Sequence, residues 1–111
     1  MTIAVDFDGT IVTNEFPHIG KPNMQIINKL IQLKKSGAKL ILWTCRVGQF
    51  LNVAIDFCTN IGLEFDAINE NLPEVIEHYG SDCRKIVADY YLDDRALDLK
   101  GFLCFLNGYS I

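Results

Sequence analysis

Short apolar runs alternate along this chain with longer segments whose apolar residues recur at helical spacing, and this alternation constrains the fold more than any other feature. The first two runs are TIAVDF (2–7) and AKLILW (38–43), each brief enough to be a strand buried on both faces. Between them, Pro22 suits a first helical position, and a helical stripe of apolar residues continues from there to Gly37. These three segments predict one β-α-β unit.

The same pattern repeats towards the C-terminus. A second helical stripe ends before Gly62, and a proline and a glycine bracket a shorter helix. The further expected elements are a helix over 47–61, a strand over 65–68, a helix over 73–80, a strand over 85–92 and a strand over 101–106. Strands that alternate with helices predict an α/β fold, here a three-layer, doubly wound, Rossmann-like parallel sheet of about five strands.

Composition narrows the class of protein. The 111 residues, of which 50% are hydrophobic, suit one domain spanning 1–111. A net charge of −4 argues against nucleic acid or an anionic membrane as a partner, although a small basic pocket would still hold one phosphate. No apolar run approaches the roughly 18 residues of a membrane span, and the acidic start MTIAVDFD lacks the basic leader of a secretory signal. We therefore expect a cytoplasmic protein.

The cysteines give no indication of a zinc site or a disulfide framework. They form no C-x-x-C pair and no ligand-like grouping with either histidine. We expect reduced thiols, mostly packed in the interior. The four are Cys45, Cys58, Cys83 and Cys104.

Polar residues stand where three of the expected strands end. Asp6 and Asp8 close the first, Thr44 follows the second, and Asp93 and Asp94 follow the fourth. In open α/β sheets, ligands bind beyond the carboxyl ends of the strands, so these side chains are expected at one rim. Carboxylates held close together repel, and a divalent cation with oxygen ligands would offset that repulsion and attract a phosphate. The pattern predicts a Mg²⁺ site.

Four ordered motifs resemble those of haloacid dehalogenase superfamily phosphatases. They are DFDGT (6–10), LILWTCR (40–46), Lys85 and YYLDD (90–94), which match D-x-D-x-T, a strand ending in Ser or Thr, a basic residue and an acidic pair. The resemblance spans nearly the whole chain and implies a Mg²⁺-dependent phosphatase. No stretch is long enough for a separate cap domain, so it resembles a small, capless member.

The resemblance implies a role for each matching residue. Asp6 would be the nucleophile that forms an aspartyl-phosphate intermediate, and Asp8 the general acid and then the general base. Thr44 and Lys85 would hold the transferring phosphoryl group, although the neighbouring Arg84 is a rival cation. Taken alone, Thr44 is also typical of a residue at a strand end whose hydroxyl hydrogen-bonds to the backbone. The D-x-D-G run alone is also typical of a solvated turn.

The implied Mg²⁺ ligands are the Asp6 carboxylate, the Asp8 backbone carbonyl, Asp93, and Asp94 directly or through water. Asp89 lies four residues before Asp93, roughly 13 Å away along an extended strand, so both cannot bind one ion. If residues 90–92 are strand, the sequence places Asp93 at the rim and excludes Asp89. The alternative is that ADYYLDD forms a loop after the strand, in which Asp89 would become a ligand. The alternative for the acidic pair is a helix N-terminal charge pair before RALDL.

The residues around these motifs leave other roles open. Arg46 follows the phosphate-binding threonine by two residues and suits either a forked contact to substrate or a surface ion pair. His18 lies in NEFPHIG, which corresponds to the flap of the family, and we assign it no catalytic role. Asn14 and Glu15 are in the same segment and have no assigned role either.

Three functional classes remain after this reading. The first is a phosphohydrolase acting on a small phosphorylated substrate or a phosphorylated macromolecule. The second is a phosphate-binding or regulatory module with the same fold and little turnover. The third is a receiver domain, which would place its phosphorylated aspartate after the third strand. Without a cap, substrate selection falls to the flap, to a large substrate or to a neighbouring subunit, and we expect a homo-oligomer.

Overall fold

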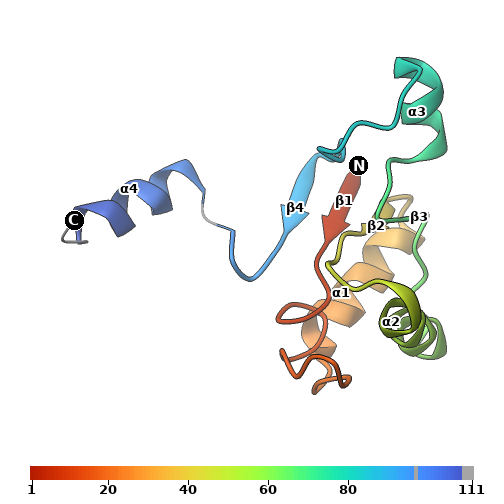
Figure 1. Ribbon diagram of the computed structural model, residues 1–111, viewed down its shortest axis with the longest axis horizontal. Helices are drawn as coiled ribbons and strands as arrows, with labels where there is room; N and C mark the ends of the chain where they lie inside the picture. Colours follow the sequence, from red (N-terminus) through yellow and green to blue (C-terminus); the bar gives the residue numbers. More distant parts are fainter. Residues whose placement is uncertain (97, 109–111) are drawn as a thin grey trace.

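The computed structural model describes residues 1–96 and 98–108, and its centre is a four-stranded, all-parallel sheet (Figure 1). The strand order is β3-β2-β1-β4. The strands are β1 (Thr2–Val5), β2 (Lys39–Leu42), β3 (Ala67–Ile68) and β4 (Tyr90–Leu92), and the helices are α1 (Met24–Lys35), α2 (Gly48–Asn60), α3 (Pro73–Tyr79) and α4 (Leu99–Asn107). The expected α/β class with a parallel sheet and flanking helices is confirmed.

The register of the sheet brings the strand ends to one edge. Val5, the last residue of β1, pairs with Leu42 on one side and Leu92 on the other, and each of these is also the last residue of its strand. Because the three strands are parallel and end level, the segments that follow them emerge side by side. This is the edge at which the sequence predicts a ligand.

One face of the sheet is covered by α1 and α2. Alternate residues of a strand point to opposite faces, and Ile3, Val5 and Leu42 belong to the same buried cluster as residues of both helices. Helix α1 contributes Ile27 and Leu30, and α2 contributes Ala54 and Cys58. Burial raises the pKa of the Cys58 thiol to about 12, and this cysteine packs as a small apolar side chain. The expectation of mostly packed cysteines is wrong, because the other three cysteines are exposed.

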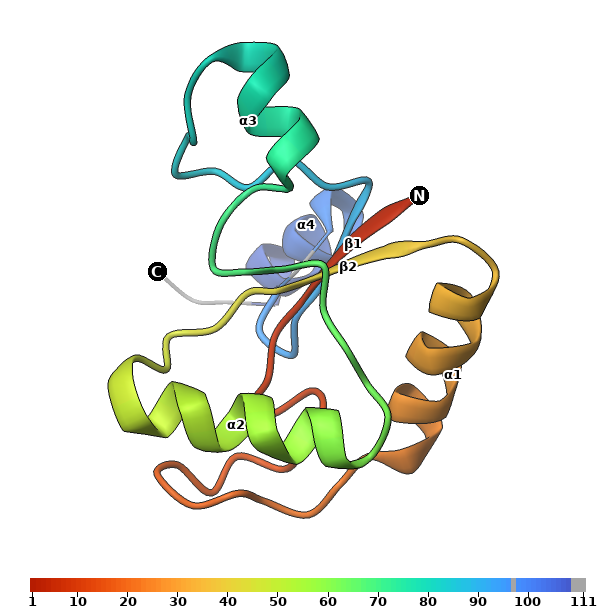
Figure 2. The ribbon, with the colours of Figure 1, turned by 90° about the vertical axis from the view of Figure 1, so that its right-hand side faces the viewer.

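The opposite face is covered more thinly. Ala4 and Ile41 pack there against Leu72 and Ile86, which lie outside α3 itself. Helix α3 buries none of its own residues and lies on the other side of the sheet from α1 (Figure 2). The cover on this face therefore depends on the loop between α3 and β4.

Asn71 fixes that loop. Its side chain is almost fully buried, donates to the carboxylate of Asp82 at 2.7 Å and to the carbonyl of Cys83 at 3.1 Å, and accepts the N–H of Val87 at 2.7 Å. These bonds from the Asn71 amide hold the pKa of Asp82 below its usual range. One buried amide thus joins three points of the segment that leads into β4.

The expected fifth strand over 101–106 is wrong, because this segment lies in helix α4. A short apolar run fits a strand or a buried helix equally well, and periodicity alone does not separate them. Asp98 decides the matter locally, since its carboxylate accepts the N–H of Gly101 and its carbonyl accepts the N–H of Phe102 at 2.9 Å. Helix α4 projects away from the sheet (Figure 1), so the described sheet has four strands instead of about five.

Two element boundaries also differ from expectation. Pro22 is not the first residue of α1, because it pairs with Val12 in a β-bridge and Asn23 caps the helix, its side chain accepting the N–H of Ile26. The fourth strand is shorter than 85–92, since the residues before Tyr90 belong to the loop held by Asn71. No helix among the described residues combines the length and hydrophobicity needed to cross a bilayer.

Replacing Asn71 by alanine is expected to lower the free energy of unfolding by about 1–3 kcal/mol, because the loop carbonyl and N–H lose their buried partner. Asn28→Ala, on the exposed side of α1, is the matched control and should change stability by less than about 0.5 kcal/mol. Urea unfolding followed by circular dichroism measures both. Equal stability of the two variants would show that Asn71 does not hold the loop.

Candidate functional site

The chain turns sharply after β1, and this turn sets the direction of both aspartates. The N–H of Asp6 donates to the carbonyl of Leu92 at 2.9 Å, which joins the end of β1 to the end of β4. Phe7 is fully buried and packs edge-on against Phe57, and its neighbours Asp6 and Asp8 line the cavity on the other side of the chain.

Gly9 allows the turn to approach the segment after β4. Its φ of +91° lies in the region that glycine adopts without strain. A Cβ atom at this position would overlap the carboxylate of Asp94. The glycine of DFDGT therefore has a spatial reason, because it leaves room for one of the acidic residues of the other motif.

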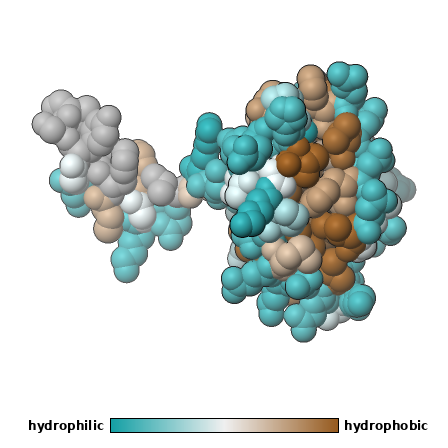
Figure 3. Space-filling model, turned by 90° about the horizontal axis from the view of Figure 1, so that it is seen from below, coloured by the Kyte–Doolittle hydropathy of each residue, from teal (hydrophilic) through white to brown (hydrophobic). Residues whose placement is uncertain are grey.

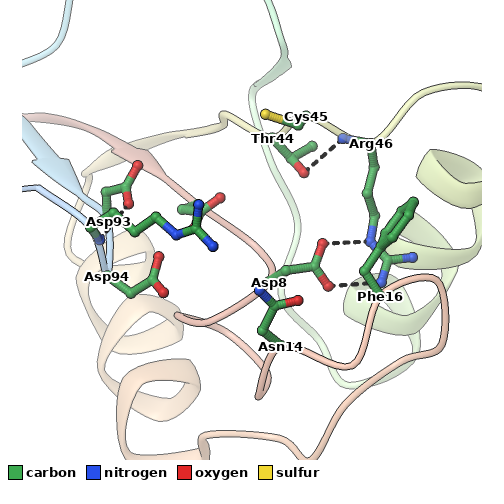
Figure 4. Close-up of a pocket in the computed structure, with 10 residues that line it drawn as sticks. Asp8, Asn14, Phe16, Thr44, Cys45, Arg46, Asp93 and Asp94 are labelled. Carbon is green, nitrogen blue, oxygen red and sulfur yellow. Dashed lines mark hydrogen bonds and ion pairs between the residues drawn. The ribbon is translucent and has the colours of Figure 1, made fainter.

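A cavity of about 430 Å³ lies beyond these strand ends (Figure 4). Its lining comes from the segments that follow β1, β2 and β4. The lining residues are Asp6, Asp8, Asn14, Phe16, Thr44, Cys45, Arg46, Asp93, Asp94 and Arg95. Four aspartates and two arginines give this lining a formal excess of two negative charges, so an anionic ligand needs further positive charge.

Three of the aspartates form a cluster. Asp6, Asp93 and Asp94 each offer a carboxylate oxygen within 4.8 Å of the others. Partial burial, the charge of Asp93, and the hydrogen bond and charge of Asp94 raise the pKa of Asp6 to about 7, against a smaller opposing effect of the Phe7 N–H. Among the ion pairs of the described residues, none involves these three carboxylates.

The donor set suits a hard divalent cation. Mg²⁺ and Ca²⁺ prefer carboxylate oxygens, and two oxygens that share one Mg²⁺ at about 2.1 Å lie at most about 4.2 Å apart. The carboxylates of Asp6, Asp93 and Asp94 are close to that limit. The predicted ligands from the first and fourth motifs are thus brought together, except that the side chain of Asp8 is engaged elsewhere.

Asp8 forms an ion pair with Arg46. Its two carboxylate oxygens accept N–H groups from Nε and Nη2 of the guanidinium, both at 2.8 Å (Figure 4). Arg46 is 2% exposed, so the pair is a buried one and differs from both earlier expectations, a substrate contact and a surface ion pair. The resemblance implies that Asp8 binds the metal ion through its backbone carbonyl, and this role is compatible with a side chain paired to Arg46.

The other N–H groups of Arg46 bind the flap and α2. Nη2 donates to the carbonyl of His18 at 2.8 Å, and Nη1 donates to the carbonyls of Pro17 and Phe50, each at 3.2 Å. His18 therefore contributes a backbone atom to the site. One guanidinium joins the first motif, the flap and the start of α2.

Thr44 lines the cavity as predicted. Its N–H donates to the side chain of Asn69 at 2.8 Å, and its hydroxyl oxygen accepts the N–H of Arg46 at 3.1 Å. The hydroxyl proton is not used in these contacts and remains available to a ligand. Asn69 holds this position from the end of β3, in a left-handed conformation with φ 54° that asparagine tolerates.

The basic residue of the third motif is not at the cavity. Lys85 and its rival Arg84 are exposed in the loop before β4, and neither belongs to the lining. Arg95 lines the cavity instead, and its backbone N–H donates to Asp93 at 2.9 Å. The sequence contained this information, because Arg95 directly follows the acidic pair that the strand end places at the rim.

Asp89 lies at the far end of β4 from the site. Its carboxylate accepts the N–H of Thr2 at 2.7 Å, and its own N–H donates to the Thr2 carbonyl at 2.8 Å. It is therefore level with the beginning of β1, whereas Asp93 follows the end of β4. The prediction that strand spacing separates Asp89 from Asp93 is confirmed.

Comparisons with known proteins establish a relative but no activity. No family model matches the sequence, and no curated protein matches it significantly. A solved structure of a conserved protein from Bacteroides thetaiotaomicron is 46% identical over 91% of this chain and 79% of that one, with a TM-score of 0.77.

The chain belongs to the same family as this Bacteroides protein. The shared fold supports the α/β architecture described above. The relative is described only as a conserved protein, so the chemistry must be argued from the site.

The elevated pKa of Asp6 predicts a pH dependence of stability in the metal-free protein. Folded Asp6 keeps its proton up to about pH 7, whereas the unfolded chain releases it near pH 3.8. Stability from this group is therefore fully present below about pH 4 and is lost as the pH rises through 7. Melting temperatures in EDTA at pH 5.5 and 8 should differ more in the wild type than in Asp6→Asn, which has no proton to lose.

The same cluster predicts stabilisation by a divalent cation. Adding MgCl₂ at pH 8 should raise the melting temperature of the wild type, and NaCl of equal ionic strength should raise it less. The cluster would be contradicted if the melting temperatures of the wild type and Asp6→Asn changed equally with pH, and if MgCl₂ and NaCl raised the melting temperature of the wild type equally.

Arg46→Met is expected to lower the free energy of unfolding by roughly 3–5 kcal/mol, because it leaves the buried Asp8 carboxylate without its partner. Asp8→Asn should lower the free energy of unfolding much less in the Arg46→Met variant than in the wild type. A double-mutant cycle measures this coupling. Lys34→Met is the control, since the Lys34–Asp66 pair is longer at 3.4 Å and more exposed, and its loss should cost at most about 1 kcal/mol. Additive effects of the two substitutions would show that Asp8 and Arg46 do not depend on each other.

Proposed function

We propose that this protein is a Mg²⁺-dependent phosphohydrolase of the haloacid dehalogenase type, which cleaves phosphate monoesters through an aspartyl-phosphate intermediate. The observation that carries the proposal is the placement of Asp6. It follows β1 directly, lies within 4.8 Å of Asp93 and Asp94, and shares a cavity with Thr44 and Arg95. The order of the four motifs along the chain supports the same assignment.

The finer architecture is part of this proposal. In the strand order β3-β2-β1-β4, the chain moves from β1 outwards to β3 and then returns to place β4 on the other side of β1. This reversal between β1 and β4 resembles the switch point of a Rossmann-like sheet. Asp6 and Asp93 come from these two strands. We propose a single capless domain whose cavity opens directly to solvent and to the substrate.

The residues fit a Mg²⁺ ion. Asp6, Asp93 and Asp94 would hold it with the backbone carbonyl of Asp8, and the ion would supply positive charge that screens the substrate phosphate and the nucleophile from each other. The formal excess of negative charge in the cavity explains why an anionic substrate requires such an ion. Partial burial is the largest cause of the raised pKa of Asp6, and the neighbouring charges of Asp93 and Asp94 raise it further.

The chain's own residues perform the transfer. A carboxylate oxygen of Asp6 attacks phosphorus, and the bond from phosphorus to the ester oxygen breaks as the acyl phosphate forms. Asp8 gives a proton to the departing oxygen, then takes one from the water that attacks the acyl phosphate, which releases phosphate and restores Asp6. The Thr44 hydroxyl donates to a phosphoryl oxygen, and Arg95 takes the charge-balancing role that the family pattern gives to a lysine.

The fork of Arg46 limits Asp8 in this role. Both oxygens of Asp8 accept guanidinium N–H groups, so a proton that Asp8 carries to the substrate must occupy a lone pair that the fork leaves unused. The same contact favours a second candidate function, a phosphate-binding or regulatory module with the metal site and little turnover. The presence of a potential nucleophile and a second carboxylate at one cavity makes the enzyme the better supported of the two.

Asp6→Asn is expected to abolish Mg²⁺-dependent hydrolysis of phosphate esters, because an amide cannot form the acyl phosphate. Asp8→Asn should retain the nucleophile and slow both protonation and hydrolysis, by about 100-fold or more. A phosphatase screen over a panel of phosphate esters measures the loss. Near-normal turnover by Asp6→Asn would refute the mechanism, and binding of phosphate by the wild type without turnover of any ester would favour the regulatory module.

The matched pair for metal binding is Asp93→Asn and Asp89→Asn, which remove the same charge from opposite ends of β4. Titration calorimetry with MgCl₂ should show much weaker binding in Asp93→Asn and nearly unchanged binding in Asp89→Asn. The reverse order would move the metal site to the other end of the strand.

A further inference from the structure

The cavity has two chemically different sides. Asp93 and Asp94 lie on one side, and the ring of Phe16 lies on the other, next to the guanidinium of Arg46 (Figure 4). The nucleophile Asp6 and the proposed metal ligands Asp93 and Asp94 form the acidic side, and Asp8 joins the two sides through its pair with Arg46. The proposed function gives the ring of Phe16 itself no role, so the ring requires another explanation.

The ring of Phe16 is held in place although it is exposed. The guanidinium carbon of Arg46 lies 5.2 Å from its centroid, and the ring of Phe50 meets it edge-on at 5.5 Å. The next two residues of the flap, Pro17 and His18, are bound through their carbonyls by Arg46. Phe16 is nevertheless 55% exposed, so much of the ring remains available for contact.

The charges of the cavity restrict what can lie against this ring. Arg46 is already matched by Asp8, and within the described lining Arg95 is the other cation. Arg95 and a bound Mg²⁺ serve the phosphoryl group in the proposed function. A leaving group with its own negative charge would therefore find no counter-charge beside Phe16, whereas an uncharged planar group would replace water on an apolar surface.

The cavity is also larger than the reaction centre alone requires. Its volume of about 430 Å³ is in the range of pockets that enclose whole small organic ligands, about 300–1,000 Å³. Exposed apolar side chains continue outside it, from Val47 at the N-cap of α2 to Phe50 and Val53, which lie three residues apart within the helix. In the view from below, the most hydrophobic surface lies in a band on the larger body of the molecule, away from the projecting helix α4 (Figure 3).

We propose that Phe16 selects the substrate, and that the substrate class is a phosphate monoester whose leaving group is uncharged and aromatic. The ring of the leaving group stacks on Phe16 while its phosphate lies towards Asp6 and Thr44. The guanidinium of Arg46 packs against the ring of Phe16 and keeps it at the cavity, and Arg46 does not itself contact the leaving group. This inference rests on the proposed function, because it assumes that the phosphate of the ester occupies the acidic side.

The test compares the affinities of two phosphonates that cannot be hydrolysed, benzylphosphonate and methylphosphonate, measured by titration calorimetry with MgCl₂ present. Wild type should bind benzylphosphonate about tenfold more tightly. Phe16→Leu keeps an apolar side chain without a ring, and it should reduce this ratio to about two. Phe16→Tyr should retain the ratio, because it keeps the ring. Tyr79→Leu removes an exposed aromatic residue of α3 outside the cavity and should leave the ratio unchanged.

Kinetics supply a second readout. Benzyl phosphate and ethyl phosphate both release simple alcohols, so a preference in kcat/KM for the benzyl ester reports recognition more than leaving-group chemistry. We expect that preference in the wild type and Phe16→Tyr, and its loss in Phe16→Leu. Melting temperatures of the variants should match the wild type within a few degrees, since Phe16 is largely exposed.

Several results would overturn the inference. If wild type binds both phosphonates equally, or if Phe16→Leu weakens both to the same extent, Phe16 does not select an aromatic group, although the proposed function stands. If Phe16→Leu changes the molar mass measured by analytical ultracentrifugation and leaves the ratio of the two phosphonate affinities unchanged, the aromatic surface is an interface between copies of the chain. If neither phosphonate binds and no ester is hydrolysed, the proposed function fails and this inference fails with it.

Discussion

The buried ion pair between Arg46 and Asp8 is the interaction on which the rest of the site depends. Its two short hydrogen bonds orient Asp8, and the other N–H groups of the same guanidinium hold the flap and the start of α2. Phe7 and Phe16 lie against the guanidinium at 5.0 and 5.2 Å, which shields the pair from water. A charge this deeply buried is stable only because every donor direction has a partner.

The same pair divides the acidic residues into two kinds. Asp8 has its counter-charge in Arg46, whereas Asp6 lies beside the carboxylates of Asp93 and Asp94. Partial burial, followed by the charges of these neighbours, raises the pKa of Asp6. The charges are therefore balanced where Asp8 meets Arg46, whereas on the side of β4 three carboxylates face the single cation Arg95 of the described lining. A divalent cation and an anionic substrate fit that second side together, which is the physical basis of the proposed phosphohydrolase.

Much of the fold was predictable because it follows from local patterns. The alternation of apolar runs and helical stripes predicted four strands and three helices near their observed positions, and the polar residues after β1, β2 and β4 predicted the edge that carries the site. The error at 101–106 had a local cause as well, since an apolar run of six residues suits either state, and the capping by Asp98 decides for the helix.

The sequence by itself determined most of the strands and helices, because their periodicity is local. It also determined that Asp6, Thr44 and Asp93 share one edge, because strands joined by helices run parallel and end on the same side of a sheet. The tertiary structure decided how the charges are paired. Arg46 meets Asp8 across 38 positions of the chain, and Arg95 reaches the cavity while Lys85 does not. Such partners depend on distances between segments remote in sequence, and no local pattern specifies those distances.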